Sequence, residues 1–244
     1  PKEEFTEKSL ETLKLVNLEG YENRMPSELS GGQQQRVAVA RAIVLKPKVL
    51  LFDEPLSNLD AKLRRQVRED IREIQQKLGV TTIYVTHDQE EALAISDKVI
   101  VMNNAIIAQQ GSPKELYNFP KTKFVANFIG DANVVKAEII NQNNNIYEIQ
   151  LAEMKINIES DQKLESSVSV SLRPEKITIS KSPEENSIHA SINNASFVGN
   201  SYQYIVNSKV GKIYVVSSNT NEIFNVGENV YLKFDENELR LLND

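Results

Sequence analysis

Serine and two glycines stand directly before a segment of this 244-residue chain that has the pattern of a helix. Gly31 and Gly32 would let the backbone approach a bound group closely. The N–H groups at the start of the expected helix, residues 33–44, would point at an anion, and Ser30 adds a hydroxyl donor. A lone Ser-Gly-Gly is more often an ordinary serine N-cap with glycines in a turn.

Two adjacent carboxylates, Asp53 and Glu54, follow the uninterrupted apolar run Val49–Phe52. Such a run predicts a strand buried on both faces of a parallel sheet, and α/β sheets bind ligands at the carboxyl ends of their strands. Asp53 could hold Mg²⁺, usually through water, and Glu54 could polarise a water for attack on a phosphoryl group. Taken alone, Asp-Glu-Pro is more often a solvated acidic turn.

A histidine, His87, follows a second apolar run, Thr81–Val85, which predicts another buried strand. An imidazole at the carboxyl end of a strand can contact a phosphate, although a lone histidine more often makes a structural hydrogen bond. Ser57–Asp60 leads into a long helix and by itself is explained as a capping turn. The other histidine, His189, lies in a polar β segment and is given no role.

The elements that must position these residues alternate between helix and strand up to about residue 130. Ala61–Leu78 places apolar residues on one helix face, and Gly79 suits its C-terminal cap. A hairpin is expected over residues 98–109, and Ser112 would cap a further helix. The sequence therefore predicts an α/β domain over residues 1–130.

The remainder, residues 131–244, has short β-rich runs separated by Asn, Gly and Ser turns. This spacing predicts a small all-β barrel or sandwich. The expected strands cover residues 134–140, 146–151, 168–172, 201–206, 213–216 and 230–234, with a hairpin turn over residues 141–145.

The composition is that of an ordinary globular protein, with 40 % hydrophobic and 25 % charged residues and a formal net charge of -6. An acidic balance argues against nucleic acid as a partner. We interpret the basic run on the long helix as a solvated face; its residues are Lys62, Arg64, Arg65 and Arg68. The absence of cysteine excludes disulfides and thiolate metal sites. No apolar run approaches the length of a membrane span, so any membrane association is expected to be peripheral.

The order and spacing of these segments closely resemble the ABC ATPases over residues 1 to about 130. The signature Leu-Ser-Gly-Gly-Gln ends at Gln33, an apolar strand ends in Asp53-Glu54-Pro55, Ser-Asn-Leu-Asp ends at Asp60, and a strand ends in Thr-His-Asp around His87. The resemblance implies the C-terminal portion of a P-loop NTPase-type nucleotide-binding domain with ATP and Mg²⁺ as its ligands.

The resemblance also implies a role for each site residue. In the family, the signature contacts the γ-phosphate of ATP bound by the opposite subunit of a homodimer, which assigns this contact to Ser30, Gly31, Gly32 and Gln33. Asp60 is assigned to the dimer interface. Within the subunit's own site, Asp53 is assigned to Mg²⁺, Glu54 to activation of the attacking water and His87 to the γ-phosphate.

The second region resembles the transport-associated OB-like (TOBE) domains through Leu172-Arg173-Pro174-Glu175. These domains follow the ATPase in importers that use a substrate-binding protein. Without the resemblance, the segment would be a charged turn between two strands.

These resemblances lead to the hypothesis of a bacterial ABC importer ATPase, a homodimer bound to integral-membrane permease subunits at the cytoplasmic face of the membrane. The segments Glu91–Asp97 and Phe128–Asn133 most resemble the branch that handles ferric iron, phosphonates or polyamines, although sugar importers share most of them. A non-transport ABC ATPase of translation or repair, and a module with only a regulatory role, are the alternatives.

The phosphate-binding loop G-x-x-x-x-G-K-[ST] of the family does not occur in this sequence. The chain is therefore expected to be the C-terminal part of a longer protein. Because that loop supplies most of the phosphate electrostatics, the 244-residue polypeptide alone is expected to be inactive.

Overall fold

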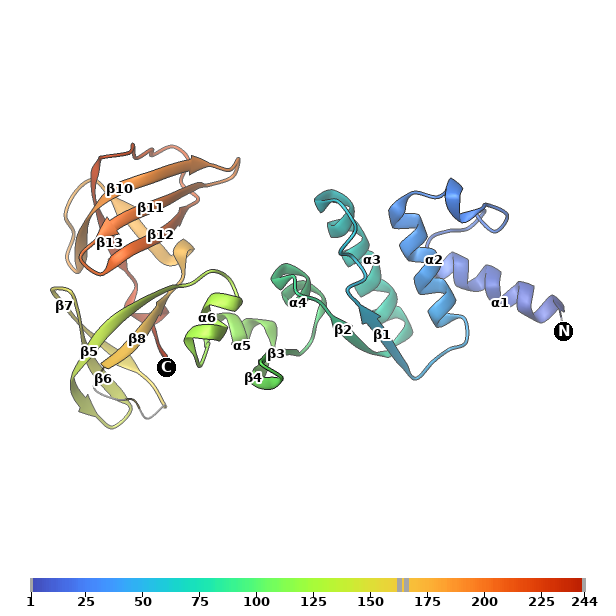
Figure 1. Ribbon diagram of the computed structural model, residues 1–244, viewed down its shortest axis with the longest axis horizontal. Coiled ribbons are helices and arrows are strands. Elements are labelled where there is room, and N and C mark those ends of the chain that lie inside the picture. The colour runs from blue at the N-terminus through green and yellow to red at the C-terminus, as the bar shows by residue number, and fades with distance from the viewer. Residues whose placement is uncertain (1, 162–163, 165–166, 243–244) are drawn as a thin grey trace. The chain divides into compact units, whose positions relative to one another are not determined.

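The computed structural model describes residues 2–161, 164 and 167–242 (Figure 1). Their contacts divide the chain into two compact units, Pro1–Asp97 and Lys98–Asp244. Contacts thus group residues 98–130 with the β-rich segment, whereas the domain boundary near residue 130 stays a prediction.

The first unit combines helices with a two-stranded parallel sheet, in which Leu51 of β1 lies opposite Ile83 of β2. The helix over Ala61–Leu78 is confirmed with its predicted bounds, and Gly79 caps it in the left-handed conformation at φ 59°. The elements are α1 Lys2–Leu15, η1 Pro26–Glu28, α2 Gly31–Ile43, β1 Val49–Asp53, α3 Ala61–Leu78, β2 Thr81–Val85 and α4 Gln89–Ile95.

The core of this unit lies where α2 and α3 pack against one face of the sheet. Val67, Ile71 and Ile74 recur at helical spacing along α3 and are buried together with Leu50 and Phe52 of β1. The apolar face of α3 therefore packs against the sheet, as its amphipathic pattern predicts.

The prediction that both strands are buried on both faces is wrong. Leu51 is 65 % exposed and Ile83 53 % exposed, and Val49 and Val85 on the same face are exposed as well. The physical reason is that β1 and β2 form a sheet of two strands, and no element within the described ranges covers this second face. Only the residues that face α2 and α3, such as Leu50 and Phe52, are buried.

The second unit opens with an antiparallel hairpin of β3 (Val99–Asn103) and β4 (Ile106–Gly111), followed by α5 (Pro113–Asn118) and α6 (Lys123–Phe128). Ser112 caps α5 as predicted, and Glu115 closes a capping box with it.

Two five-stranded antiparallel sheets complete this unit, in the orders β14-β8-β5-β6-β7 and β12-β11-β10-β13-β9. All six expected strands are present, and the strands that sequence patterns missed are β7, β9, β10 and β14. Alternate side chains of the two sheets share one hydrophobic core. The bounds are β5 Asn133–Asn143, β6 Ile146–Leu151, β7 Met154–Glu159, β8 Ser167–Leu172, β9 Ile177–Ser180, β10 Ser187–Phe197, β11 Tyr202–Ser208, β12 Gly211–Ser217, β13 Asn229–Phe234 and β14 Arg240–Leu242, with short η2 Pro174–Lys176 and η3 Glu236–Glu238.

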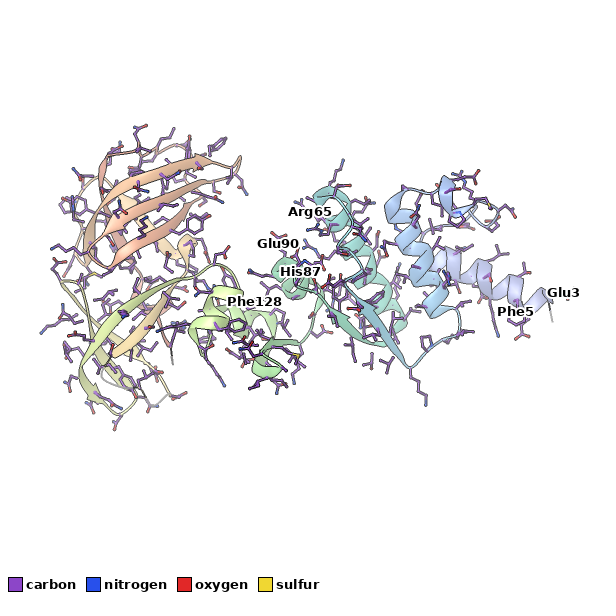
Figure 2. All side chains as sticks on the ribbon, in the orientation of Figure 1. Glu3, Phe5, Arg65, His87, Glu90 and Phe128 are labelled. Atoms are coloured by element: carbon purple, nitrogen blue, oxygen red, sulfur yellow. The ribbon has the colours of Figure 1, made fainter. Side chains whose placement is uncertain are left out.

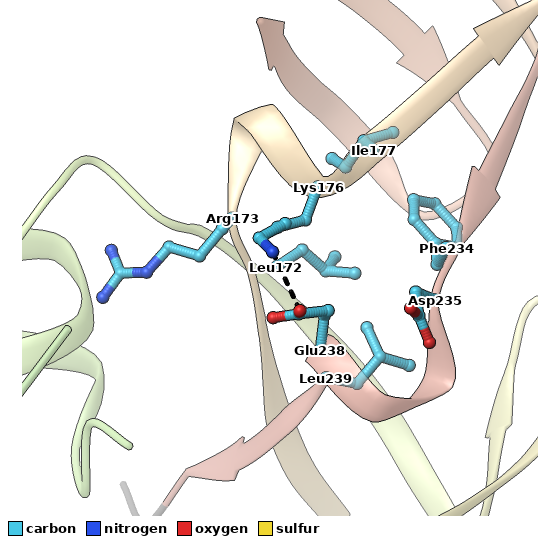
Figure 3. Close-up of a pocket in the computed structure, with 8 residues that line it drawn as sticks. All are labelled: Leu172, Arg173, Lys176, Ile177, Phe234, Asp235, Glu238 and Leu239. Atoms are coloured by element: carbon cyan, nitrogen blue, oxygen red, sulfur yellow. Dashed lines mark hydrogen bonds and ion pairs between the residues drawn. The ribbon is translucent and has the colours of Figure 1, made fainter. Parts of the chain in front are cut away.

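Arg173, which follows β8, is only 5 % exposed. Its guanidinium donates to the carbonyl of Tyr117 at the end of α5 (Nε–O 3.1 Å) and to those of Ala126, Ile129 and Gly130 in and after α6 (3.2 Å to Ala126). Figure 3 shows this side chain pointing toward these helices, away from the small cavity lined by Leu172 and its neighbours. The arginine is therefore a shared C-terminal cap for two helices, beyond the charged turn that the sequence alone indicated.

Candidate active site

The signature segment forms the first turn of α2. Ser30 is the N-cap, and its hydroxyl accepts from the N–H of Gln33 (3.4 Å) while the Gln33 side chain accepts from the N–H of Ser30 (2.9 Å). Gly31 and Gly32 are therefore the first helical residues. The expectation that they precede the helix is wrong, because the capping box closes around them.

The two glycines have different surroundings. Gly31 is exposed, whereas Gly32 is buried against α3: a Cβ at position 32 would lie 2.7 Å from Leu63 Cδ1 and 3.3 Å from Val67 Cγ2. Gln33 in turn donates to the hydroxyl of Tyr21 (3.2 Å). Gly32 and Gln33 thus also shape the segment that presents Ser30 and Gly31.

The carboxylates lie at the carboxyl end of β1. Asp53 is the last residue of the strand, opposite Val85 of β2, and is exposed. Glu54 follows it with a left-handed backbone at φ 43°, held there by a hydrogen bond from its N–H to the Val85 carbonyl (2.9 Å). Such a conformation is uncommon for a residue other than glycine and is often found at functional sites.

His87 comes from the neighbouring strand end and meets Glu54. Its Nδ1 lies 3.1 Å from Glu54 Oε1, and the two side chains are 74 % and 47 % exposed. Figure 2 labels His87 at the end of the turn before α4. The structure therefore brings together two of the residues that the sequence proposed for phosphate chemistry.

Asp60 is the N-cap of α3, where its side chain accepts from the N–H groups of Lys62 (3.1 Å) and Leu63 (3.0 Å). This is the capping function that the residue type favours. A role in a dimer interface stays a prediction.

Arginines on α3 make ion pairs that sequence reasoning missed. Arg64 contacts Asp88 (3.3 Å), Arg68 contacts Glu90 (3.6 Å), and Arg72 contacts Asp97. The interpretation of this run as a solvated face is wrong for Arg64 and Arg68, because the segment around α4 places carboxylates beside them. In the sequence, these arginines recur every fourth residue, which places them on one face of α3, and this spacing was the signal that could have indicated a shared partner.

The strand end offers the adjacent carboxylates of Asp53 and Glu54 to a metal ion. The described residues contain no group of three or more His, Cys, Asp or Glu side chains arranged around a metal position. Mg²⁺ nevertheless suits such a place, because it keeps several waters and takes one or two carboxylates together with phosphate oxygens. Asp53, exposed at the strand end, has the chemistry for this.

Comparison with known proteins decides the family. A model described as "ABC transporter" matches residues 2–57, and one described as "TOBE domain" matches residues 170–242. The protein named "Fe(3+) ions import ATP-binding protein FbpC" from Agrobacterium fabrum is 45 % identical over 242 residues, which cover 99 % of this chain and 68 % of that protein. The chain belongs to the ATP-binding subunits of ABC importers.

A further relative agrees with this assignment. A protein of the same name from Photorhabdus laumondii is 45 % identical over 96 % of this chain and 65 % of its own length. The solved structure of cbiO1 from Clostridium perfringens, described as part of the ABC transporter complex cbiONQ, is 35 % identical, with a TM-score of 0.45 over 48 % of this chain and 47 % of that one.

As an ABC importer subunit with a TOBE domain, the chain is an ATPase of the transport machinery, and the family implies permease partners in the membrane. The matched ABC range includes the signature, Asp53 and Glu54. Within the described residues, no helix combines the length and apolar character needed to cross a bilayer.

Proposed function

We propose that this chain takes part in the ATP hydrolysis that drives import of ferric iron, with Glu54 and His87 as its catalytic pair. The observation that carries the catalytic part is their contact at the carboxyl ends of two parallel strands, at 3.1 Å. Ligands of α/β sheets bind at this edge. The relatives match nearly the whole chain, and their names support ferric iron as cargo.

Glu54 is suited to accept a proton from the attacking water because it is an exposed carboxylate in a fixed backbone conformation. His87 directs one ring nitrogen to Glu54, which leaves Nε2 to face a phosphate oxygen. Asp53 would hold Mg²⁺, and the bound ion would neutralise negative charge on the phosphates.

The signature is proposed to act on the nucleotide of a second copy, so that the working form is a homodimer. Ser30 offers a hydroxyl and Gly31 an exposed backbone at the positive end of α2. Gly32 would take part through its backbone only, since its Cα faces α3, and Gln33 through the capping box that fixes the turn.

Integral-membrane permease subunits, and a substrate-binding protein acting through them, complete the proposed assembly at the cytoplasmic face of the membrane. No described residue is assigned to the cargo itself. Phosphonates, polyamines and sugars remain outcomes of the test below, as does a role outside transport.

The test is uptake of radiolabelled ferric iron by cells in which the gene is deleted and then restored. We expect deletion to abolish uptake, restoration to recover it, and restoration with Glu54→Gln to fail. Uptake of a phosphonate, a polyamine and a sugar is measured in the same cells. Unchanged ferric iron uptake after deletion would reject this cargo, and loss of one of the other uptakes would identify its replacement.

A further inference from the structure

Beneath the turn that carries His87 lies a buried carboxylate, Glu91, which is only 3 % exposed. Its Oε2 accepts hydrogen bonds from the hydroxyls of Tyr84 (3.0 Å) and Thr86 (2.8 Å), and its Oε1 lies 4.0 Å from Arg64 Nε. Burying a charge is costly, and an apolar side chain of similar size would pack with less penalty. The carboxylate therefore calls for a reason beyond packing.

The hydroxyl of Thr86 joins the two sides of this turn. It donates to Glu91 and accepts from the backbone N–H of Asp88 at 3.0 Å. The residues immediately before and after His87 are thus fixed by one side chain, which in turn is fixed by Glu91.

Arg64 connects the same turn to the segment that follows Glu54. Its guanidinium donates to Asp88 Oδ2 (3.3 Å) and to the carbonyl of Leu59 (3.0 Å). Ser57, in that segment, donates to the Glu54 carbonyl (3.1 Å). Arg64 therefore ties the turn around His87 to the segment that follows Glu54. Ser57 fixes the start of that segment at Glu54.

We propose that Thr86, Glu91 and Arg64 are positioning residues that hold His87 against Glu54. An exposed side chain loses rotamer freedom when it is held in one place, and a catalytic pair works only while its geometry persists. Because the hydrogen-bond network of these residues already fixes the backbone on both sides of the imidazole, less conformational freedom is lost when the side chain of His87 is held against Glu54. The inference rests on the proposed role of the Glu54–His87 pair in ATP hydrolysis.

The test is an NMR double-mutant cycle on the 244-residue chain. The ring signals of His87 are assigned by their loss in His87→Ala, and those of His189 serve as a reference. Glu54→Gln is introduced into the wild type and into Thr86→Val, which removes the hydroxyl but keeps the shape. We expect Glu54→Gln to shift the His87 signals in the wild type, and to shift them much less in Thr86→Val.

Two further measurements separate positioning from general damage. Exchange of the Asp88 amide should become about fivefold faster in Thr86→Val, the factor for one net hydrogen bond. Thr86→Ser should restore both properties, and Thr82→Val, which removes another hydroxyl from β2, should change neither. If the first unit does not fold in Thr86→Val, as judged from the amide signals of α3, Glu91→Gln takes its place in the cycle.

An equal response of His87 to Glu54→Gln in both backgrounds would overturn the proposal, and so would the absence of any response in the wild type. In the assembled transporter, Thr86→Val should lower kcat for ATP while leaving KM unchanged. If Glu54→Gln itself left ATP turnover intact, the proposed function would fail while the NMR result on positioning stood.

Discussion

Glu54 and His87 meet because β1 and β2 pair in parallel and in register, so that Asp53 lies opposite Val85 and the residues that follow both strands face each other. The left-handed backbone of Glu54 directs its carboxylate toward the end of β2, to 3.1 Å from the imidazole of His87. The contact thus depends on strand register and on one unusual backbone conformation together.

Substitution of either member should stop hydrolysis in the assembled transporter. We expect Glu54→Gln to lower kcat for ATP by about 10²–10⁴-fold, the range for a positioned base, and His87→Ala by about 10²–10³-fold, the range for one hydrogen-bond donor to the transition state. Neither side chain is buried, so the thermal midpoint should stay close to that of the wild type. Wild-type turnover in either variant would refute the assigned roles.

The 244-residue polypeptide by itself should not turn over ATP, because it contains no G-x-x-x-x-G-K-[ST] loop to bind the phosphates. The measurement is phosphate release at saturating MgATP from the purified chain. Steady release that Glu54→Gln abolishes would contradict this expectation, whereas release unaffected by Glu54→Gln would indicate a contaminating ATPase.

Gly32→Val should destabilise the first unit, because even a Cβ at this position would lie 2.7 Å from Leu63 Cδ1 and 3.3 Å from Val67 Cγ2. We expect a loss of about 1–3 kcal/mol in the free energy of unfolding, as for other overpacked sites. The matched control is Ala38→Val at an exposed position of the same helix, which should cost only about 0.5 kcal/mol through helix propensity. Equal losses in urea unfolding would argue against close packing of Gly32 on α3.

Arg173→Met should destabilise the second unit by about 3 kcal/mol, because it leaves the buried carbonyls of Tyr117, Ala126 and Ile129 without their charged donor. Arg173→Lys should recover only part of this, since a single ammonium cannot bond to the ends of both helices at once. Lys176→Met removes only a surface ion pair with Glu238 and should leave unfolding close to wild type. If Lys at position 173 restored full stability, charge alone would account for the effect.

Burial, aided by the hydrogen bond to Glu175, raises the pKa of the Tyr117 hydroxyl to about 12 from 10.0. Between these two values the unfolded chain loses this proton while the folded chain keeps it, so stability falls as pH rises from 10 to 12. Tyr117→Phe lacks this contribution. The variant should therefore lose less stability than the wild type across this window, as measured by urea unfolding at a series of pH values, and parallel losses would show that Tyr117 does not contribute.

The sequence by itself determined the family and most of the elements, with β7, β9, β10 and β14 as strands that it did not predict. The amphipathic pattern of Ala61–Leu78 and the cap at Gly79 gave that helix its correct bounds, because local periodicity and backbone preference are properties of neighbouring residues. The signature, Asp53-Glu54 and His87 were recognisable in the same way, since the family resemblance lies in residue types and their order along the chain.

Tertiary structure alone decided which residues touch. It placed His87 on Glu54, buried Glu91 beneath the turn, turned Gly32 toward α3 and made Arg173 the cap of two helices. It also left Leu51 and Ile83 exposed where apolar runs had predicted burial. These outcomes depend on which elements pack against which face, and such contacts join residues far apart in the chain that no local pattern relates.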